Sequence, residues 1–155
     1  MRGCHWTAPL AAALACCSTD EPGVTRFAPL EAEAVRDVEA KLVWTARDSG
    51  RELSWPDADR YCRELAFGSI RTGWRLPSSA ELAGLYDTSM EQPCGDEVAC
   101  RADPSIDLSS PYQWSATAPR RNRRVYFDFS VGTELSPLIR PTLTRRALCV
   151  HSEVD

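Results

Sequence analysis

Histidine is scarce in this chain of 155 residues, and its scarcity limits the catalytic and metal-binding sites that the chain can form. The two histidines are His5 and His151, and only His151 lies beyond the N-terminal segment. Ser–His–Asp and Cys–His mechanisms both need a histidine base, so catalysis of either type would depend on His151 alone. Zinc sites need Cys and His ligands at tight spacing, and the sequence has no such cluster. We therefore expect no catalytic site, no bound metal and no cofactor.

A hydrophobic run long enough to cross a bilayer, about 20 residues, is also absent. The most apolar run, residues 8–15, follows the charged start at Arg2 and ends before Cys16 and Cys17. A charged start, a short apolar run and small residues at its end are typical of a signal peptide. The two cysteines resemble the lipidation site of a bacterial lipobox, which would anchor the protein to a membrane through Cys16 or Cys17. The alternatives are an ordinary cleaved signal peptide and a wrongly assigned start codon.

These N-terminal features predict how the chain is organised and where it resides. The polar residues after Cys17, which include Pro22 and Gly23, are typical of a short tether. We predict a signal peptide over 1–17, a tether over 18–30 and one folded domain over 31–155. Such a protein is exported to the periplasm, the outer membrane or the cell surface.

Free cysteine is not expected in the mature domain. Three of the seven cysteines lie in the first seventeen residues, and the even number that remains suits disulfides in an oxidising compartment. The remaining four are Cys62, Cys94, Cys100 and Cys149. Cys94 and Cys100 share a polar, Pro-rich segment, residues 87–111, that we expect to be a long loop, and a bond between them would close a small ring. That bond would leave Cys62 and Cys149 as a second pair, although the other two pairings remain open.

Periodicity and capping signals predict a domain that contains both helices and strands. Ser54 is a good N-cap with Asp57 three residues later, and Trp55, Ala58, Cys62 and Leu65 then form one apolar stripe. A second helix starts at the capping box of Ser78 and Glu81. Strands are predicted over residues 42–44, 125–130 and 147–150, with a hairpin turn at Gly132.

Several of these segments occur together in a known family. They are residues 42–44, 55–65, 104–107, 114–117, 127–132 and 149–150, and the motif Trp74, Arg75, Leu76 and Pro77 followed by a capped helix. In this order and spacing the chain, from about residue 42 to 151, resembles the Lcl C-terminal domain family, which is named for a Legionella collagen-like adhesin. The Trp-Arg-Leu-Pro motif is the most specific element of the resemblance.

The resemblance implies an α+β domain with a C-type-lectin-like fold, related to that of formylglycine-generating enzymes. Two helices would flank small antiparallel β-sheets, and the termini would lie close together. It also implies that Cys62 of the first helix pairs with Cys149 near the last strand. The copper-binding cysteine pair of the related oxidases has no clear equivalent here. A diverged enzyme of that type is therefore the less favoured alternative to a binding domain.

Positive charge is concentrated in one segment of a chain whose net charge is −4. Residues 118–146 carry seven arginines and two carboxylates, whereas residues 42–110 are acidic. The arginines are Arg120, Arg121, Arg123, Arg124, Arg140, Arg145 and Arg146. Guanidinium groups bind sulfates, phosphates and carboxylates through paired hydrogen bonds. We therefore predict a site at residues 120–124 for an acidic or sulfated glycan or an envelope protein, with Trp114 as a platform for sugar.

Three competing interpretations remain. The arginines could form a solvated loop, or they could pair with the acidic half of the same domain. The protein could also have a purely structural or assembly role in the envelope. The mild net negative charge argues against a nucleic-acid partner. The acidic residues of 96–107 lack the calcium motifs of true C-type lectins, so a solvated acidic loop is expected there.

Overall fold

The computed structural model describes residues 23, 25–31, 33–118 and 120–153. The predicted signal peptide, with the lipidation candidates Cys16 and Cys17, lies outside the described residues, as do residues 18–22 and 24 of the predicted tether. No helix in the described part of the chain is long and apolar enough to cross a membrane.

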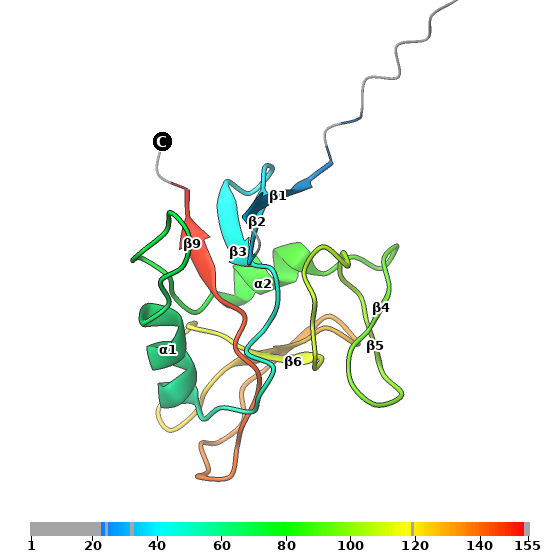
Figure 1. The fold of residues 1–155 in the computed structure, drawn as a ribbon. Helices are drawn as coiled ribbons and strands as arrows, with labels where there is room; N and C mark the ends of the chain where they lie inside the picture. The colour runs from blue at the N-terminus through cyan, green and yellow to red at the C-terminus, as the bar shows by residue number, and fades with distance from the viewer. Residues whose placement is uncertain (1–22, 24, 32, 119, 154–155) are drawn as a thin grey trace, which may run out of the picture.

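A four-stranded antiparallel sheet joins the first and last segments of the described chain. Its strands are β1 (Phe27–Glu31), β2 (Ala34–Asp37), β3 (Leu42–Thr45) and β9 (Val150–Ser152), in that spatial order. β-Branched and aromatic residues favour strands, and those at the centre of β3 are buried on both faces of the sheet. Figure 1 shows β9 beside β3, so the first and last strands of the domain belong to one sheet.

The sheet starts earlier than the sequence predicted. The predicted tether includes residues 27–30, but in the structure these residues belong to β1, which pairs with β2. The reason is tertiary, because Phe27 buries its ring in the core and Arg26 forms a bidentate ion pair with the fully buried Asp37.

The last strand starts later than the sequence predicted. Residues 147–149 are buried, but they bond to the last residue of β3 and to the segment after it rather than forming a regular strand. Ser49 N donates to the carbonyl of Ala147 over 2.8 Å, and Thr45 N donates to the carbonyl of Cys149 over 3.0 Å. Regular pairing with β3 begins only at Val150.

Both helices begin where their capping residues predict. In α1 (Trp55–Arg63) the Ser54 side chain accepts from the backbone N–H of Asp57, and in α2 (Ser79–Leu85) Ser78 and Glu81 form the complete capping box. The buried residues of α1 pack in one hydrophobic cluster and those of α2 in another. The stripe predicted for the first helix is shorter than expected, because Leu65 lies beyond the end of α1 and Trp55 is only half-buried.

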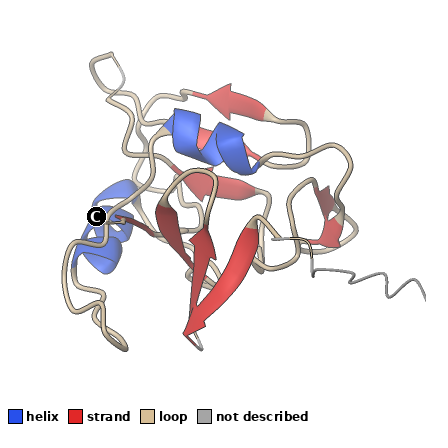
Figure 2. Cartoon of the chain, turned by 90° about the horizontal axis from the view of Figure 1, so that it is seen from above, coloured by secondary structure: helices blue, strands red, loops and turns tan. Residues whose placement is uncertain are grey.

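Two smaller antiparallel sheets complete the fold. Strands β6 (Tyr112–Trp114), β7 (Tyr126–Asp128) and β8 (Thr133–Leu135) form one, and Gly132 has a positive φ in the β7–β8 turn, as its place in the sequence predicted. The other is the short hairpin of β4 (Gln92–Pro93) and β5 (Ala99–Cys100), inside the segment predicted as a loop. Figure 2 shows the strands separated by long loops and the two helices lying apart. The α+β prediction is confirmed.

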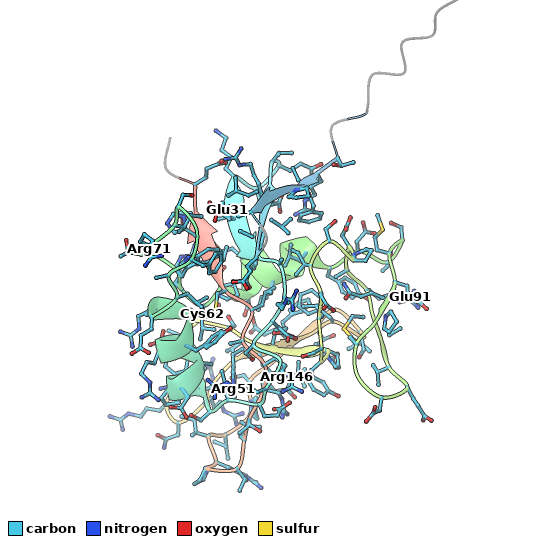
Figure 3. The ribbon with its side chains drawn as sticks, viewed as in Figure 1. Glu31, Arg51, Cys62, Arg71, Glu91 and Arg146 are labelled. Carbon is cyan, nitrogen blue, oxygen red and sulfur yellow. A yellow bond between two sulfur atoms is a disulfide. The ribbon has the colours of Figure 1, made fainter. Side chains whose placement is uncertain are left out.

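Both disulfides follow the predicted pairing. Cys62 of α1 bonds to Cys149, immediately before β9, and Cys94 bonds to Cys100 across the β4–β5 hairpin. Figure 3 shows Cys62 on the inner side of α1. All four cysteines are buried.

Candidate functional site

One face of the β6–β7–β8 sheet carries a group of aromatic rings. Tyr112 and Trp114 of β6 lie on the same face, since side chains alternate along a strand, and Trp114 is opposite Tyr126 in the register. The ring of Tyr126 packs edge-to-face against both, with centroids 5.6 Å from Tyr112 and 6.2 Å from Trp114. On the opposite face, Gln113 and Phe127 point into the interior and are buried.

Residues 145 and 146 bring a guanidinium group onto these rings. Arg145 exchanges two backbone hydrogen bonds with Leu53, and Arg146 bonds through its backbone to Tyr112 and Trp114. This extended segment places the Arg145 guanidinium over Tyr126, 4.4 Å from the ring centroid, and 5.0 Å from that of Tyr112. A cation over an aromatic face is attracted by the ring quadrupole, so Arg145 is held in place without a carboxylate.

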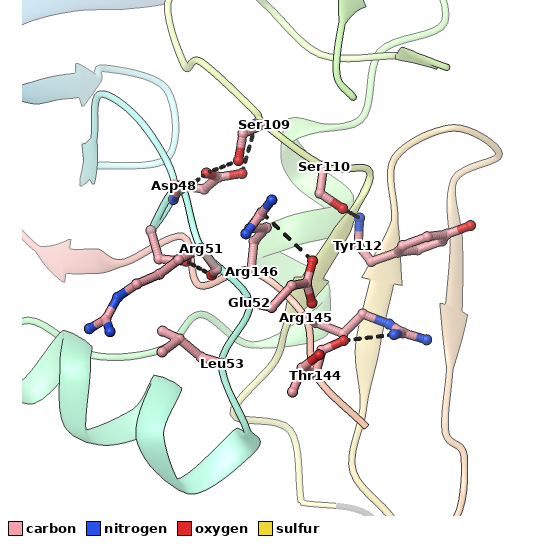
Figure 4. A network of polar contacts seen from close by, with 12 residues as sticks. Asp48, Arg51, Glu52, Leu53, Ser109, Ser110, Tyr112, Thr144, Arg145 and Arg146 are labelled. Atoms are coloured by element: carbon pink, nitrogen blue, oxygen red, sulfur yellow. Dashed lines mark hydrogen bonds and ion pairs between the residues drawn. The ribbon is translucent and has the colours of Figure 1, made fainter. Parts of the chain in front are cut away.

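A buried carboxylate fixes the loop from which β6 starts. Asp48 accepts hydrogen bonds from the backbone N–H and hydroxyl of Ser109, from the side-chain amide of Gln113 and from the backbone N–H of Gly50, all between 2.6 and 2.9 Å. Figure 4 shows this group beside Arg146, whose Nε lies 3.8 Å from Glu52. The network joins the turn before α1 to the start of the aromatic face.

A pocket of about 210 Å³ opens beside the aromatic face. The start of α1 and the loop of residues 139–143 form its walls, and its lining is mainly apolar. Trp55, Trp114, Arg124, Ile139, Arg140 and Leu143 are among the lining residues. The Arg124 guanidinium lies over the ring of Trp55, 4.4 Å from its centroid. We call this cavity the tryptophan pocket.

Backbone pairing holds the segment of residues 120–124 beside the loop of residues 136–139, and Arg124 is the residue of this segment that lines the pocket. Ile139 N donates to the carbonyl of Asn122 over 2.8 Å, and Arg124 N donates to the carbonyl of Pro137 over 3.3 Å. The Arg123 side chain reaches the carbonyl of Ser136 at 2.5 Å. The β7–β8 ribbon thus extends beyond its regular strands, and it carries the cluster predicted from the sequence to the rim of the tryptophan pocket.

Most of the arginines in this part of the chain have no carboxylate partner among the described residues. Of the seven arginines between residues 118 and 146, only Arg146 lies within ion-pair distance of a described carboxylate. By contrast, six of the nine other described arginines form such pairs. The predicted alternative, pairing with the acidic half of the domain, therefore applies to Arg146 alone. The unpaired set, which we call the arginine surface, is Arg120, Arg121, Arg123, Arg124, Arg140 and Arg145.

The tryptophans occupy different positions from those expected of a sugar platform. Trp114 is only 1% exposed and its indole N–H donates to the carbonyl of Leu53 over 2.7 Å, so it forms the floor of the pocket rather than a platform. The half-buried ring of Trp55 lies beside it and donates to the carbonyl of Ser115. The sequence did not indicate that Trp55 lines a pocket, because it falls on the apolar stripe of a helix, where aromatic residues are usually core residues.

The other sequence candidates lie apart from this site. His151 is on β9, with its ring edge-to-face against Trp74, and Figure 1 shows β9 at the opposite end of the molecule from the loop of residues 136–142. Arg75 of the Trp74–Pro77 motif bonds through its backbone to Val150, which gives that motif a structural role. No three His, Cys, Asp or Glu side chains among the described residues gather as a metal site would require.

Known proteins resemble this chain in two respects. The chain shares 40% identity over 60 residues with the Bacteroides ovatus protein named "Putative fimbrium tip subunit Fim1C". Those residues are 37% of this chain but only 11% of that protein, so the chain spans a small part of its relative's length. No solved structure matches. The family model of the Lcl C-terminal domain matches residues 33–149, most of the chain and nearly the span of the resemblance. The chain therefore belongs to the Lcl C-terminal domain family.

Proposed function

We propose that this protein is an exported, non-catalytic binding domain of an adhesion type that recognises an acidic or sulfated polysaccharide. The observation that carries the proposal is the arginine surface, six arginines beside an apolar pocket that form no ion pair with any described carboxylate. A guanidinium group makes two parallel hydrogen bonds to a carboxylate or sulfate. A polymer that repeats such groups can engage several arginines at once, and the linkage raises the overall affinity without any new type of contact.

The location that we propose follows from the N-terminus and from the relative. The short apolar run and Cys16 or Cys17 support export and a lipid anchor, and the name of the Bacteroides ovatus relative places that protein on a fimbrium. We also propose that the domain has the C-type-lectin-like fold. Supporting features are the two helices, the adjacent β3 and β9, and the disulfide from α1 to the chain before β9.

Heparin-affinity chromatography tests the binding function. Replacing Arg120, Arg121, Arg123 and Arg124 with serine removes four positive charges from the arginine surface. Each lost ionic contact weakens binding to a polyanion and reduces its salt dependence. We expect the variant to elute at clearly lower salt than the wild type, with an unchanged circular dichroism spectrum.

The matched control removes the same charge elsewhere. Serine at Arg36, Arg60, Arg63 and Arg101 takes away four arginines that are already ion-paired. If net charge alone determines retention, both variants will elute early and the proposed site is wrong. If the arginine surface is the site, the control will elute close to the wild type.

The relative supports a second candidate, an assembly role in a surface structure. Its name describes a fimbrium tip subunit, and the β7–β8 ribbon exposes Val131, Leu135, Leu138 and Ile139, which could pack against another subunit. Cross-linking in the native envelope distinguishes the candidates. Capture of one stoichiometric protein partner through this ribbon, without polysaccharide binding, would favour assembly.

A further inference from the structure

The tryptophan pocket is more apolar than an anion site requires. A sulfate or carboxylate on a polymer needs only guanidinium groups at the surface, as on Arg120 and Arg121. Here the walls are Trp55, Ile139 and Leu143, and the two charged lining groups are Arg124 and Arg140. The pocket therefore joins an apolar cavity to a cationic rim, and a ligand that fits both parts carries an apolar group close to an anion.

The geometry of Arg124 leaves it available to a ligand. Its guanidinium lies over the ring of Trp55, 4.4 Å from the centroid, and its Nη1 donates to the carbonyl of Arg123 over 3.0 Å. Within the described chain, Nε and Nη2 make no hydrogen bond and meet no carboxylate. Stacking restricts the group before binding, which reduces the conformational entropy that a ligand's carboxylate must overcome.

We infer that the tryptophan pocket is a subsite for an acylated acidic sugar, one whose ring carries both a carboxylate and an acetyl-type group. The acyl methyl lies among Trp55, Ile139 and Leu143, and the carboxylate pairs with Arg124 and Arg140. This inference rests on the proposed function, in which such a sugar is a unit or a terminus of the recognised polysaccharide.

The size of the pocket supports a single sugar rather than an oligosaccharide. Sites for drug-sized ligands enclose roughly 300–1,000 Å³, and this cavity is smaller, about 210 Å³. The aromatic floor and wall suit the apolar face of a sugar ring, and the remaining units of a polymer would continue over the exposed Arg120, Arg121 and Arg123.

Three related monosaccharides test the two halves of the pocket separately. The first is the methyl glycoside of N-acetylneuraminic acid, which carries a carboxylate and an acetamido group. The second has a hydroxyl group in place of the acetamido group, and the third is the carboxyl methyl ester of the first. Binding is followed by calorimetry and by the indole N–H resonances of Trp55 and Trp114, which line the pocket.

We expect only the first sugar to bind well. Replacing the acetamido group with a hydroxyl takes its methyl out of the apolar pocket and should weaken binding by roughly tenfold or more. Esterifying the carboxylate removes the charge that pairs with Arg124 and should weaken binding by about tenfold as well. The inference is wrong if the hydroxyl analogue or the ester binds as tightly as the acid with the acetamido group. It is also wrong if the indole resonances stay unchanged at saturating sugar, or if an acidic aromatic peptide binds there instead of the sugar.

A pair of neighbouring substitutions separates this subsite from the arginine surface. Ile139→Trp fills the pocket, whereas Leu138→Trp places the same ring on an adjacent residue of similar exposure outside the lining. We expect Ile139→Trp to lose the monosaccharide, Leu138→Trp to bind it, and both to keep wild-type elution from heparin. Equal sugar binding by the two variants overturns the subsite and leaves the polyanion function standing. The heparin elution of the Arg→Ser variant tests the polyanion function separately, whatever sugar binding the two tryptophan variants show.

Discussion

At the scale of single residues, Asp48 is a buried carboxylate that accepts four hydrogen bonds. It is 4% exposed and accepts from Gly50, Ser109 and Gln113. Buried donors that lose their acceptor cost more free energy than the bond contributed, because each is left without water as well. The carboxylate therefore holds together the segments that precede α1 and β6.

Replacing Asp48 with alanine tests this role. We expect the free energy of unfolding to fall by about 3 kcal/mol, since four hydrogen bonds, one of them from the buried side chain of Gln113, lose one shared acceptor. Urea denaturation followed by tryptophan fluorescence measures the change. Asp107→Ala is the control, because Asp107 is exposed and its side chain makes no hydrogen bond in the described structure. That variant should stay within about 0.5 kcal/mol of the wild type, and an equal loss in both would contradict the role of Asp48.

Residue-scale features were only partly predictable from the sequence. The arginine cluster is visible because it is contiguous, but the absence of carboxylate partners depends on which segments meet in space. Trp114 and Trp55 show the same limit. Both are aromatic residues in apolar sequence patterns. Which of the two rings is accessible depends on tertiary packing, because Trp114 packs against Tyr126 and Arg124 lies over Trp55.

At the scale of elements, the carboxylate of Glu81 joins the start of α2 to Arg75, whose backbone pairs with Val150 of β9. Glu81 receives two hydrogen bonds from Arg75, at 2.7 and 2.8 Å, and one from the backbone N–H of Ser78 at 2.7 Å. The hydrogen bonds from Arg75, more than any other contact, hold the pKa of Glu81 below its ordinary value of 4.5, although burial acts in the opposite direction.

This shift predicts a pH-dependent contribution to stability. A carboxylate whose pKa is lowered by folding stabilises the protein above its ordinary pKa, and the contribution disappears as the pH falls through the lowered value. Glu81→Gln should therefore cost about 1–2 kcal/mol at neutral pH, and the difference from the wild type should shrink below pH 4.5. Urea denaturation over a pH series measures it. A difference that does not vary with pH would show that the charge of Glu81 is unimportant.

Helices were easier to predict than strands for a physical reason. The Ser78–Glu81 box is local, so four neighbouring residues suffice to place the start of α2. The strands are short, and their ends depend on partners far away in the sequence. Accordingly the sequence did not predict β1, β2, β6 or the two-residue strands of the β4–β5 hairpin, and β9 begins at Val150 rather than at 147.

At the scale of the whole molecule, the Cys62–Cys149 bond joins α1 to the chain that enters the sheet at β9. The two cysteines are 87 residues apart, whereas Cys94 and Cys100 are six apart. The sequence left three pairings open, because spacing alone cannot decide which cysteines meet. In the structure the longer bond links the α1 cluster to the main sheet, and the shorter one only closes a hairpin.

The two bonds should therefore differ in how much they stabilise the fold. A cross-link that closes a long loop restricts the unfolded chain more, so replacing Cys62 and Cys149 with alanine should cost about 4–5 kcal/mol, and replacing Cys94 and Cys100 about 2–3 kcal/mol. Guanidinium denaturation under oxidising conditions measures both. Reducing agent should lower the stability of each variant to a common value, because each then loses its remaining bond.

The same pair of variants separates stability from binding. The β4–β5 hairpin lies away from the loop of residues 136–142 in Figure 1, and neither of its cysteines lines the tryptophan pocket. The variant without Cys94 and Cys100 should thus elute from heparin with the wild type at temperatures where it remains folded. The Cys62–Cys149 bond is less suitable for this comparison, because Cys62 lies in α1 and the first residue of α1, Trp55, forms a wall of the pocket. If the hairpin variant lost polyanion binding while folded, the binding site would have to include the β4–β5 hairpin, and the arginine surface would not be sufficient.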